Sequence, residues 1–308
     1  MKNVTLRTDA SFREQLQEEH HWSFGVSPFC MLQIDMIQQF PADYMHQCCL
    51  GVMRKLIVLW LRGKLSTRLS SGQLREISSR LLGLRPFMPD LFARKPRGLE
   101  NIDRWKATEL RQFVLYTGKI VLKGVLSDEL YEHFMLFSVA LAILVCPHLV
   151  KQYSCFASDL LFDFVEDGRK LYGDAFLVYN VHSMVHLASD AHAYCGLDEC
   201  SSFPFENYLH QLKRLVHSGR NPLSQIIKRL GEIDKHREEL SNKPAAVVET
   251  QKPNNVFVLS NLQCCEVISV VDATGEVDRM VRYRVYDNLK PLFMQPCDSR
   301  LIGVYKAQ

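Results

Sequence analysis

The sequence lacks the patterns that mark membrane, secreted and nucleotide-driven proteins. Its longest apolar run, residues 134–146, is shorter than the roughly 20 residues a helix needs to cross a bilayer. Its N-terminal segment has neither an apolar core nor a small-residue cleavage site. No P-loop, dinucleotide-binding glycine pattern, nucleophile elbow or kinase signature occurs. We therefore expect an intracellular protein without a membrane span.

Cysteine pairing patterns are also missing. Ten cysteines are present, but none forms a C-x-x-C pair. This spacing excludes a zinc ribbon and a thioredoxin-type redox site. In an intracellular protein we expect the thiols to stay reduced.

The composition is that of a globular protein. Of 308 residues, 47% are hydrophobic and 23% charged, with a net charge of +3. The length allows one large unit and one small one, with a sizeable core in the larger. The small net charge neither requires nor excludes nucleic acid, so any basic surface must come from local clusters.

Helical periodicity dominates the first 243 residues. Apolar residues recur at intervals of three and four in residues 43–65, which predicts an amphipathic helix. Ser127 is a good N-cap for a helix that contains the apolar run 134–146. Further helices are expected at 157–172, 176–193, 204–218 and 226–240. Residues 244–255 read as a linker, and the β-branched segment 256–308 as a small β-rich tail. The predicted fold class is therefore mainly α with a small β-rich C-terminal unit.

The segment FPFENYLHQLKRLVHS holds the first candidate site residue. With Pro204 at the start of a helix, Glu206 falls in the first turn, on a stripe that also carries His210 and Lys213. A structural interpretation needs no catalysis, because a glutamate there complements the helix dipole. One carboxylate does not make a magnesium site, since Mg²⁺ chemistry on phosphates needs at least two acidic ligands.

Two further segments carry acids beside histidines. Asp35 precedes the pair Asp43 and His46, for which the structural interpretation is a helix cap with a partly buried, inward-turned histidine.

In VHSMVHLASDAH, His182, His186 and Asp190 are four residues apart and so share one helical face. That spacing suits zinc. Ser183, however, replaces the glutamate of a metalloprotease motif, and structural histidines are the commoner outcome.

Two basic clusters complete the candidates. One flanks a proline-rich loop and the other lies on the last helices; their candidate DNA contacts are Arg94, Lys95, Arg97, Lys213, Arg214 and Arg220. Phosphate contact is one interpretation and a solvated basic face is the other.

Several segments together resemble a known family. They include FPADYMHQCCLGVMRKL, RKPRGLENIDRWKATELRQFVLYTG, VYNVHSMVHLASDA, FPFENYLHQLKRLV and CDSRLIGVYK. They are similar to the C-terminal half of transposase-like proteins of animal genomes related to CACTA/EnSpm transposases. The most specific pieces are the Asp-x-x-His of DYMH and the pair VHSMVHLA and FPFENYLHQLK.

The resemblance implies a ribonuclease-H-like core in which two aspartates and a glutamate hold Mg²⁺ for DNA cutting and joining. It places Glu206 at the glutamate position, Asp43 and His46 after the second aspartate, and residues 1–243 as the helical insertion with its closing helix. Asn207 stands where plant relatives have arginine. The two aspartates and a cysteine pair are expected upstream of residue 1.

These observations lead to one expected function and one alternative. We expect a transposon-derived, transposase-like fragment that associates with duplex DNA in the nucleus and is catalytically incomplete, with no cofactor of its own. Glu206 would then be a vestigial metal-ligand position. The alternative is a domesticated protein-interaction module without DNA activity, in which the basic clusters only solvate the surface.

Overall fold

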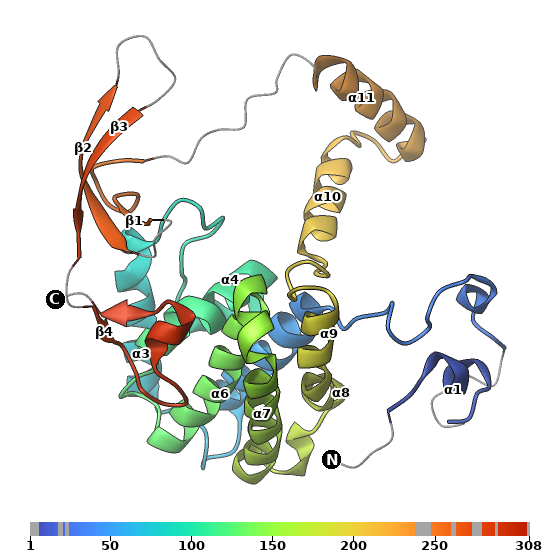
Figure 1. The fold of residues 1–308 in the computed structure, drawn as a ribbon, viewed down its shortest axis with the longest axis horizontal. Coiled ribbons are helices and arrows are strands. Elements are labelled where there is room, and N and C mark those ends of the chain that lie inside the picture. The colour runs from blue at the N-terminus through green and yellow to red at the C-terminus, as the bar shows by residue number, and fades with distance from the viewer. Residues whose placement is uncertain are drawn as a thin grey trace.

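The computed structural model describes residues 6–17, 21, 25–237, 248–259, 263–272, 279–286 and 289–306. The chain is mainly α, with a small antiparallel sheet near the C-terminus (Figure 1). The predicted fold class is thus confirmed in its helical and β-rich parts. Among the described residues, no helix is long and apolar enough to span a membrane. All ten cysteines are free thiols.

The core of the protein is a set of packed helices from the first two thirds of the chain. Their bounds are η3 Met45–Met53, α2 Arg54–Arg62, α3 Ser71–Leu84, η4 Arg85–Phe87, η5 Leu99–Arg104, α4 Ala107–Gln112, η6 Phe113–Thr117, α5 Gly118–Val121, α6 Asp128–Leu144 and α7 Pro147–Tyr172. Large aromatic side chains such as Trp60, Phe113, Phe134 and Phe164 are fully buried at its centre. Burying such rings supplies much of the hydrophobic stabilisation.

Helices α6 and α7 form the central hairpin, and local sequence signals set their ends. The Ser127 side chain accepts a hydrogen bond from the Leu130 N–H, which caps α6 as predicted. Helix α7 begins with Pro147 and stops at Gly173, whose φ of 86° few other residues adopt. The helix therefore begins ten residues before residue 157, the start that the periodicity predicts.

The segment predicted as an amphipathic helix over residues 43–65 is helical, but it begins with the wide turns of a π-helix, η3, before α2. Gly51 allows a close approach here. A Cβ at this position would come within 2.5 Å of the Asn180 side-chain nitrogen. A side chain at residue 51 would therefore force the Asn180 side chain to move away from η3.

Residues predicted as one helix over 176–193 form three consecutive pieces. After the short η7 Asp174–Phe176, they are α8 Tyr179–His182, the 3₁₀ turn η8 Ser183–His186 and α9 Leu187–Ala193. The Ser183 hydroxyl donates to the Tyr179 carbonyl, a local bond that competes with regular helix geometry.

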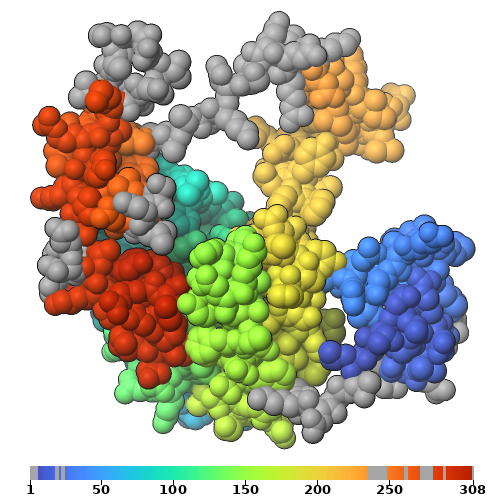
Figure 2. Space-filling model, viewed as in Figure 1, coloured from blue at the N-terminus to red at the C-terminus, as the bar shows by residue number. Residues whose placement is uncertain are grey.

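Helices α10 (Phe203–Arg214) and α11 (Pro222–Arg237) extend away from this core. Figures 1 and 2 show them as a projecting arm, and α10 has no buried residue. We call residues 203–237 the α10–α11 arm. The predicted helices 204–218 and 226–240 correspond to them, although residues 238–240 lie outside the described part of the chain.

The C-terminal residues form two small sheets. Strands β1 Val256–Val258, β2 Cys264–Asp272 and β3 Arg279–Val285 pair antiparallel in that order, and β4 Lys290–Pro291 pairs with β5 Tyr305–Lys306 beside η9 Ser299–Ile302. Phe293 is buried in the helical core, so this last segment packs on the helices. The sequence also predicts a turn at residues 272–275, of which 273–275 lie outside the described residues. The domain boundaries at 243 and 255 stay a prediction.

At the other end, α1 Asp9–Arg13 and η2 Pro28–Met31 belong to an N-terminal segment that lies to one side of the core (Figure 1). Arg13 holds it together: its guanidinium donates to the carbonyls of Cys30 and Ile34, both at 2.6 Å, and pairs with Asp9 at 2.8 Å.

Candidate functional site

Two long-range hydrogen bonds bring the three motif segments together. The Ala42 N–H donates to Asp190 Oδ2 at 3.0 Å, and the Ser202 N–H donates to Asp43 Oδ1 at 2.8 Å. Ser202 is the N-cap residue of α10, the helix that carries Glu206. The start of η3 therefore contacts both the histidine-bearing segment and the base of α10, and we call this meeting point the motif junction.

Asp43 organises the junction. Its carboxylate also accepts the N–H groups of Met45 (3.3 Å) and His46 (3.1 Å), and it lies 2.5 Å from His46 Nδ1. Burial opposes ionisation, but the hydrogen bonds from Ser202 and His46 outweigh it and lower the pKa of Asp43. The predicted capping role is thus confirmed. The inward turn predicted for His46 is wrong: its side chain is 55% exposed, because the ring folds back onto Asp43.

A second charged group adjoins the junction, and no sequence signal indicated it. The Tyr44 hydroxyl donates to Asp198, while Arg111 donates from Nε to the Tyr44 oxygen (2.6 Å) and from a terminal nitrogen to Asp198 (2.7 Å). Tyr44 is buried, and burial together with the neighbouring Asp198 carboxylate raises its pKa, so it stays protonated. The three residues lie far apart in the sequence, so only the packing of η3, α4 and the loop before α10 joins them.

The histidine pair shares one face, as predicted. The rings of His182 and His186 lie 5.9 Å apart between centroids, and both residues are exposed. Partial burial, and then the proximity of His182, lower the pKa of His186. The Asp190 carboxylate accepts the Ala42 N–H and, among the described residues, has no hydrogen bond with either ring. Within the described residues, no three His, Cys, Asp or Glu side chains are grouped as metal ligands would be.

Glu206 lies in the first turn of α10, with Pro204 at its start, as predicted. Its side chain is exposed, and among the described residues it belongs to no group of acidic side chains, with Asp35 or Asp43, that could hold a metal ion. Asp35 instead caps its own turn by accepting the N–H groups of Ile37 and Gln38 at 2.8 and 2.7 Å.

The short loop GLDECSSF between the histidine segment and FPFENYLHQLK predicts antiparallel packing of their two helices, and this prediction is wrong. Helix α10 has no buried residue, and it leaves the helical core beyond the end of α9 (Figure 1). The apolar stripe that would have supported such packing exists, but Phe205 and Leu209 are 71% and 59% exposed. Contact between the two segments runs through Asp43 and Ser202 at the base of α10.

The six candidate DNA contacts divide by their partners. Arg97 donates to Glu109 at 2.6 and 2.7 Å, and Glu109 is only 4% exposed, so this arginine compensates a buried charge. Lys95 donates to Asp90 at 2.8 Å and to the Met88 carbonyl. The other four, which are exposed and have no ion pair in the described part of the chain, are Arg94, Lys213, Arg214 and Arg220.

Arg94 lies beside the base of the arm. With Arg111, Phe203 and Pro204 it lines a cavity of about 370 Å³ between the proline-rich loop, α4 and the start of α10. Lys213, Arg214 and Arg220 lie further along the arm. The structure therefore brings one cation of the first cluster to the helix that carries the second.

Positive charge is concentrated in the α10–α11 arm. Residues 203–237 hold seven Lys and Arg against three Asp and Glu, a net +4, whereas the rest of the chain holds 30 against 31, a net −1. The arm thus accounts for the entire net positive charge. Such an asymmetry is the electrostatic footprint that polyanion-binding proteins show.

Comparison with known proteins adds no relative, since no family model, curated protein or solved structure matches the chain.

Proposed function

We propose that this chain is a transposase-like, DNA-associated helical module, and that it is catalytically incomplete. The observation that carries the proposal is the exposed, net +4 α10–α11 arm on an otherwise near-neutral body. A sequence-independent attraction between such a surface and the phosphates of duplex DNA follows from counterion release. Binding to DNA would place the protein in the nucleus.

The resemblance to CACTA/EnSpm-related transposases gains support from the motif junction. The DYMH segment, the histidine segment and the FPFENYLHQLK segment are the most specific parts of that resemblance, and they meet through Asp43, Asp190 and Ser202. If these segments, which lie more than 130 residues apart in the sequence, serve a common structural purpose, they must contact one another in the fold, and they do.

Catalysis by this chain alone is not part of the proposal. Phosphoryl transfer with Mg²⁺ needs several convergent oxygen ligands. Glu206 is exposed on the arm, while Asp43 is turned towards the Ser202 N–H and His46. Glu206 is therefore proposed as a vestigial ligand position.

The test is the salt dependence of binding to a 30-bp duplex, followed by fluorescence anisotropy. The triple variant Lys213→Ala, Arg214→Ala, Arg220→Ala should weaken binding and reduce the slope of log K against log salt by about 2 to 3, because each phosphate contact contributes about 0.9. The matched control removes three exposed cations from the body, Arg68→Ala, Arg75→Ala and Lys151→Ala. Equal losses in both variants, or no duplex binding by the wild type, would refute the proposal.

One observation favours the alternative, a protein-interaction module. The arm exposes apolar side chains that usually meet a partner: Phe205, Tyr208, Leu209, Leu223 and Ile227 are between 50% and 73% exposed. Binding through these side chains would change little with salt and would be lost in Phe205→Ser with Leu209→Ser. DNA binding that survives this double variant separates the two functions.

A further inference from the structure

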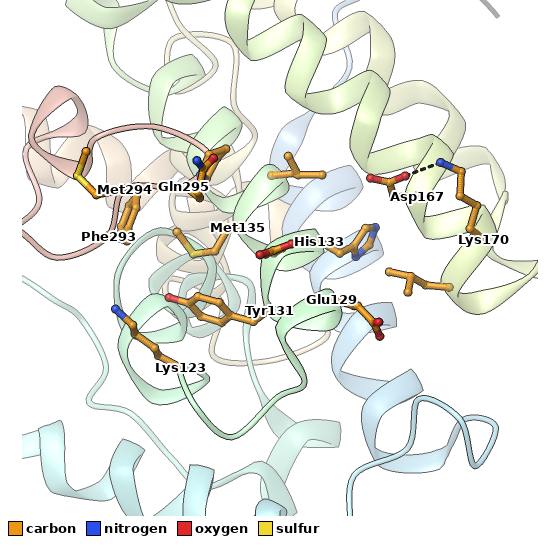
Figure 3. A pocket seen from close by; sticks show the side chains of 14 residues that line it. Lys123, Glu129, Tyr131, His133, Met135, Asp167, Lys170, Phe293, Met294 and Gln295 are labelled. Atoms are coloured by element: carbon orange, nitrogen blue, oxygen red, sulfur yellow. Dashed lines mark hydrogen bonds and ion pairs between the residues drawn. The ribbon is translucent and has the colours of Figure 1, made fainter.

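A large cavity of the described structure lies away from the motif junction. It has a volume of about 840 Å³ and lies between α6, the end of α7 and residues 293–296 of the C-terminal segment (Figure 3). Cavities of this size are typical of small-molecule sites. Its apolar lining comes from three separate parts of the chain, through Met135, Leu171 and Phe293 among others.

His133 supplies a buried acceptor in this lining. Its Nε2 lies 2.9 Å from the Phe164 carbonyl oxygen, and its ring stacks on the Phe164 ring at 4.4 Å between centroids. A carbonyl can only accept, so Nε2 carries the proton and Nδ1 of the neutral ring is an acceptor. Burial lowers the pKa of His133 to about 4, which keeps the ring neutral at pH 7.

Nδ1 of His133 is buried and has no hydrogen-bond partner, and the residue is 2% exposed. A buried polar atom of this kind costs free energy until a donor reaches it. Figure 3 shows the ring in the middle of the lining, with Asp167 on one side and Glu129 on the other.

The charged groups of the lining are unequally engaged. Lys170 donates to Asp167 at 2.8 Å, and Lys123 donates to the Leu292 carbonyl at 3.1 Å. Glu129 and Glu132 also line the cavity, on successive turns of α6, and neither has an ion pair among the described residues. Lys170 is therefore ion-paired and Lys123 bonds to a carbonyl without losing its charge, whereas the carboxylates of Glu129 and Glu132 and one imidazole nitrogen remain as unused acceptors.

From this imbalance we propose that the cavity binds an amphipathic organic amine. The ammonium group lies between Glu129 and Glu132, one donor of the ligand reaches Nδ1 of His133, and the apolar body contacts Met135, Leu171 and Phe293. An anionic ligand of the same shape is attracted by Lys123 but repelled by Glu129 and Glu132. This proposal does not depend on DNA binding, because the cavity and the arm share no residue.

The test uses dansylcadaverine, an apolar fluorophore with a primary amine, and its neutral analogue that ends in a hydroxyl group. Fluorescence titration of the full chain should show saturable binding of the amine and at least about fivefold weaker binding of the alcohol. The double variant Glu129→Gln with Glu132→Gln should lower the affinity for the amine about five- to tenfold, since exposed ion pairs are individually modest. The matched control, Asp159→Asn with Asp163→Asn, removes two exposed charges of α7 outside the lining and should change nothing.

Nδ1 of His133 is tested separately, because replacing a buried side chain can unfold the protein. In ¹⁵N-labelled protein, its resonance should shift on addition of dansylcadaverine, and on addition of the alcohol it should shift only at the correspondingly higher concentrations that the weaker affinity requires. Equal affinity for amine and alcohol, unchanged affinity in the Glu129 and Glu132 double variant, or a stationary Nδ1 resonance at saturation would each overturn the proposal.

Discussion

Replacing Asp43 by alanine should loosen the whole motif junction, because one carboxylate holds two distant segments. The variant loses the cap at the start of η3, a loss of about 1 kcal/mol. It also leaves the half-buried Ser202 N–H without the acceptor it has at 2.8 Å, which costs about 1–3 kcal/mol more. We expect the free energy of unfolding to fall by about 2–4 kcal/mol in total, equivalent to a melting temperature lower by about 4–16 °C.

Hydrogen exchange of the backbone amides shows where in the protein Asp43→Ala loosens the structure, and by how much. In Asp43→Ala, backbone amides of residues 197–206 and the first turn of α10 should exchange faster, because α10 loses its connection to η3. Asp43→Asn keeps an acceptor oxygen and should show a smaller change. The matched control is Asp35→Ala, which removes an aspartate that caps only its own turn.

The stability that the Asp43 carboxylate contributes depends on pH, and the direction of that dependence can be predicted. The folded-state pKa of Asp43 is lowered, so its ionised form stabilises the fold fully above the unfolded value of about 3.9. That contribution is lost as the pH falls through the folded pKa. The difference in unfolding free energy between wild type and Asp43→Asn should therefore be largest above about pH 4. It should shrink towards zero as the pH falls below that value. A constant difference, or unchanged exchange near α10 in Asp43→Ala, refutes the role assigned to Asp43.

Three further outcomes are expected. Purified chain should not nick plasmid DNA with Mg²⁺ or Mn²⁺; nicking that Glu206→Ala abolishes would contradict this. The Lys119 amine is buried with a pKa lowered to about 7 by burial, so the unfolded state binds the extra proton between about pH 7 and 10. Denaturant unfolding should show stability rising with pH there, and a Lys119→Met variant that keeps the full slope would disprove the assignment. Arg97→Ala should lower stability by about 1–3 kcal/mol by leaving Glu109 unpaired, whereas Arg94→Ala should not. Equal melting temperatures for the two variants would rule out the structural role of Arg97.

The local features of this protein were determined by the sequence alone. The cap at Ser127, the place of Pro204 and Glu206 in the first turn of α10, and the shared face of His182 and His186 all depend on residues two to four positions apart. Spacing and side-chain chemistry fix such contacts before any tertiary packing exists. For the same reason the mainly helical fold class could be predicted.

Contacts between distant residues were decided only by the tertiary structure. Asp43 and Ser202 are 159 positions apart, and the group of Tyr44, Arg111 and Asp198 spans three elements. The exposure of α10 could not be predicted either, because an apolar stripe indicates that a helix has a partner without indicating which one. Loop closure can join any of many polar residues at similar entropic cost, so the pairs that form depend on how α6, α7 and η3 pack.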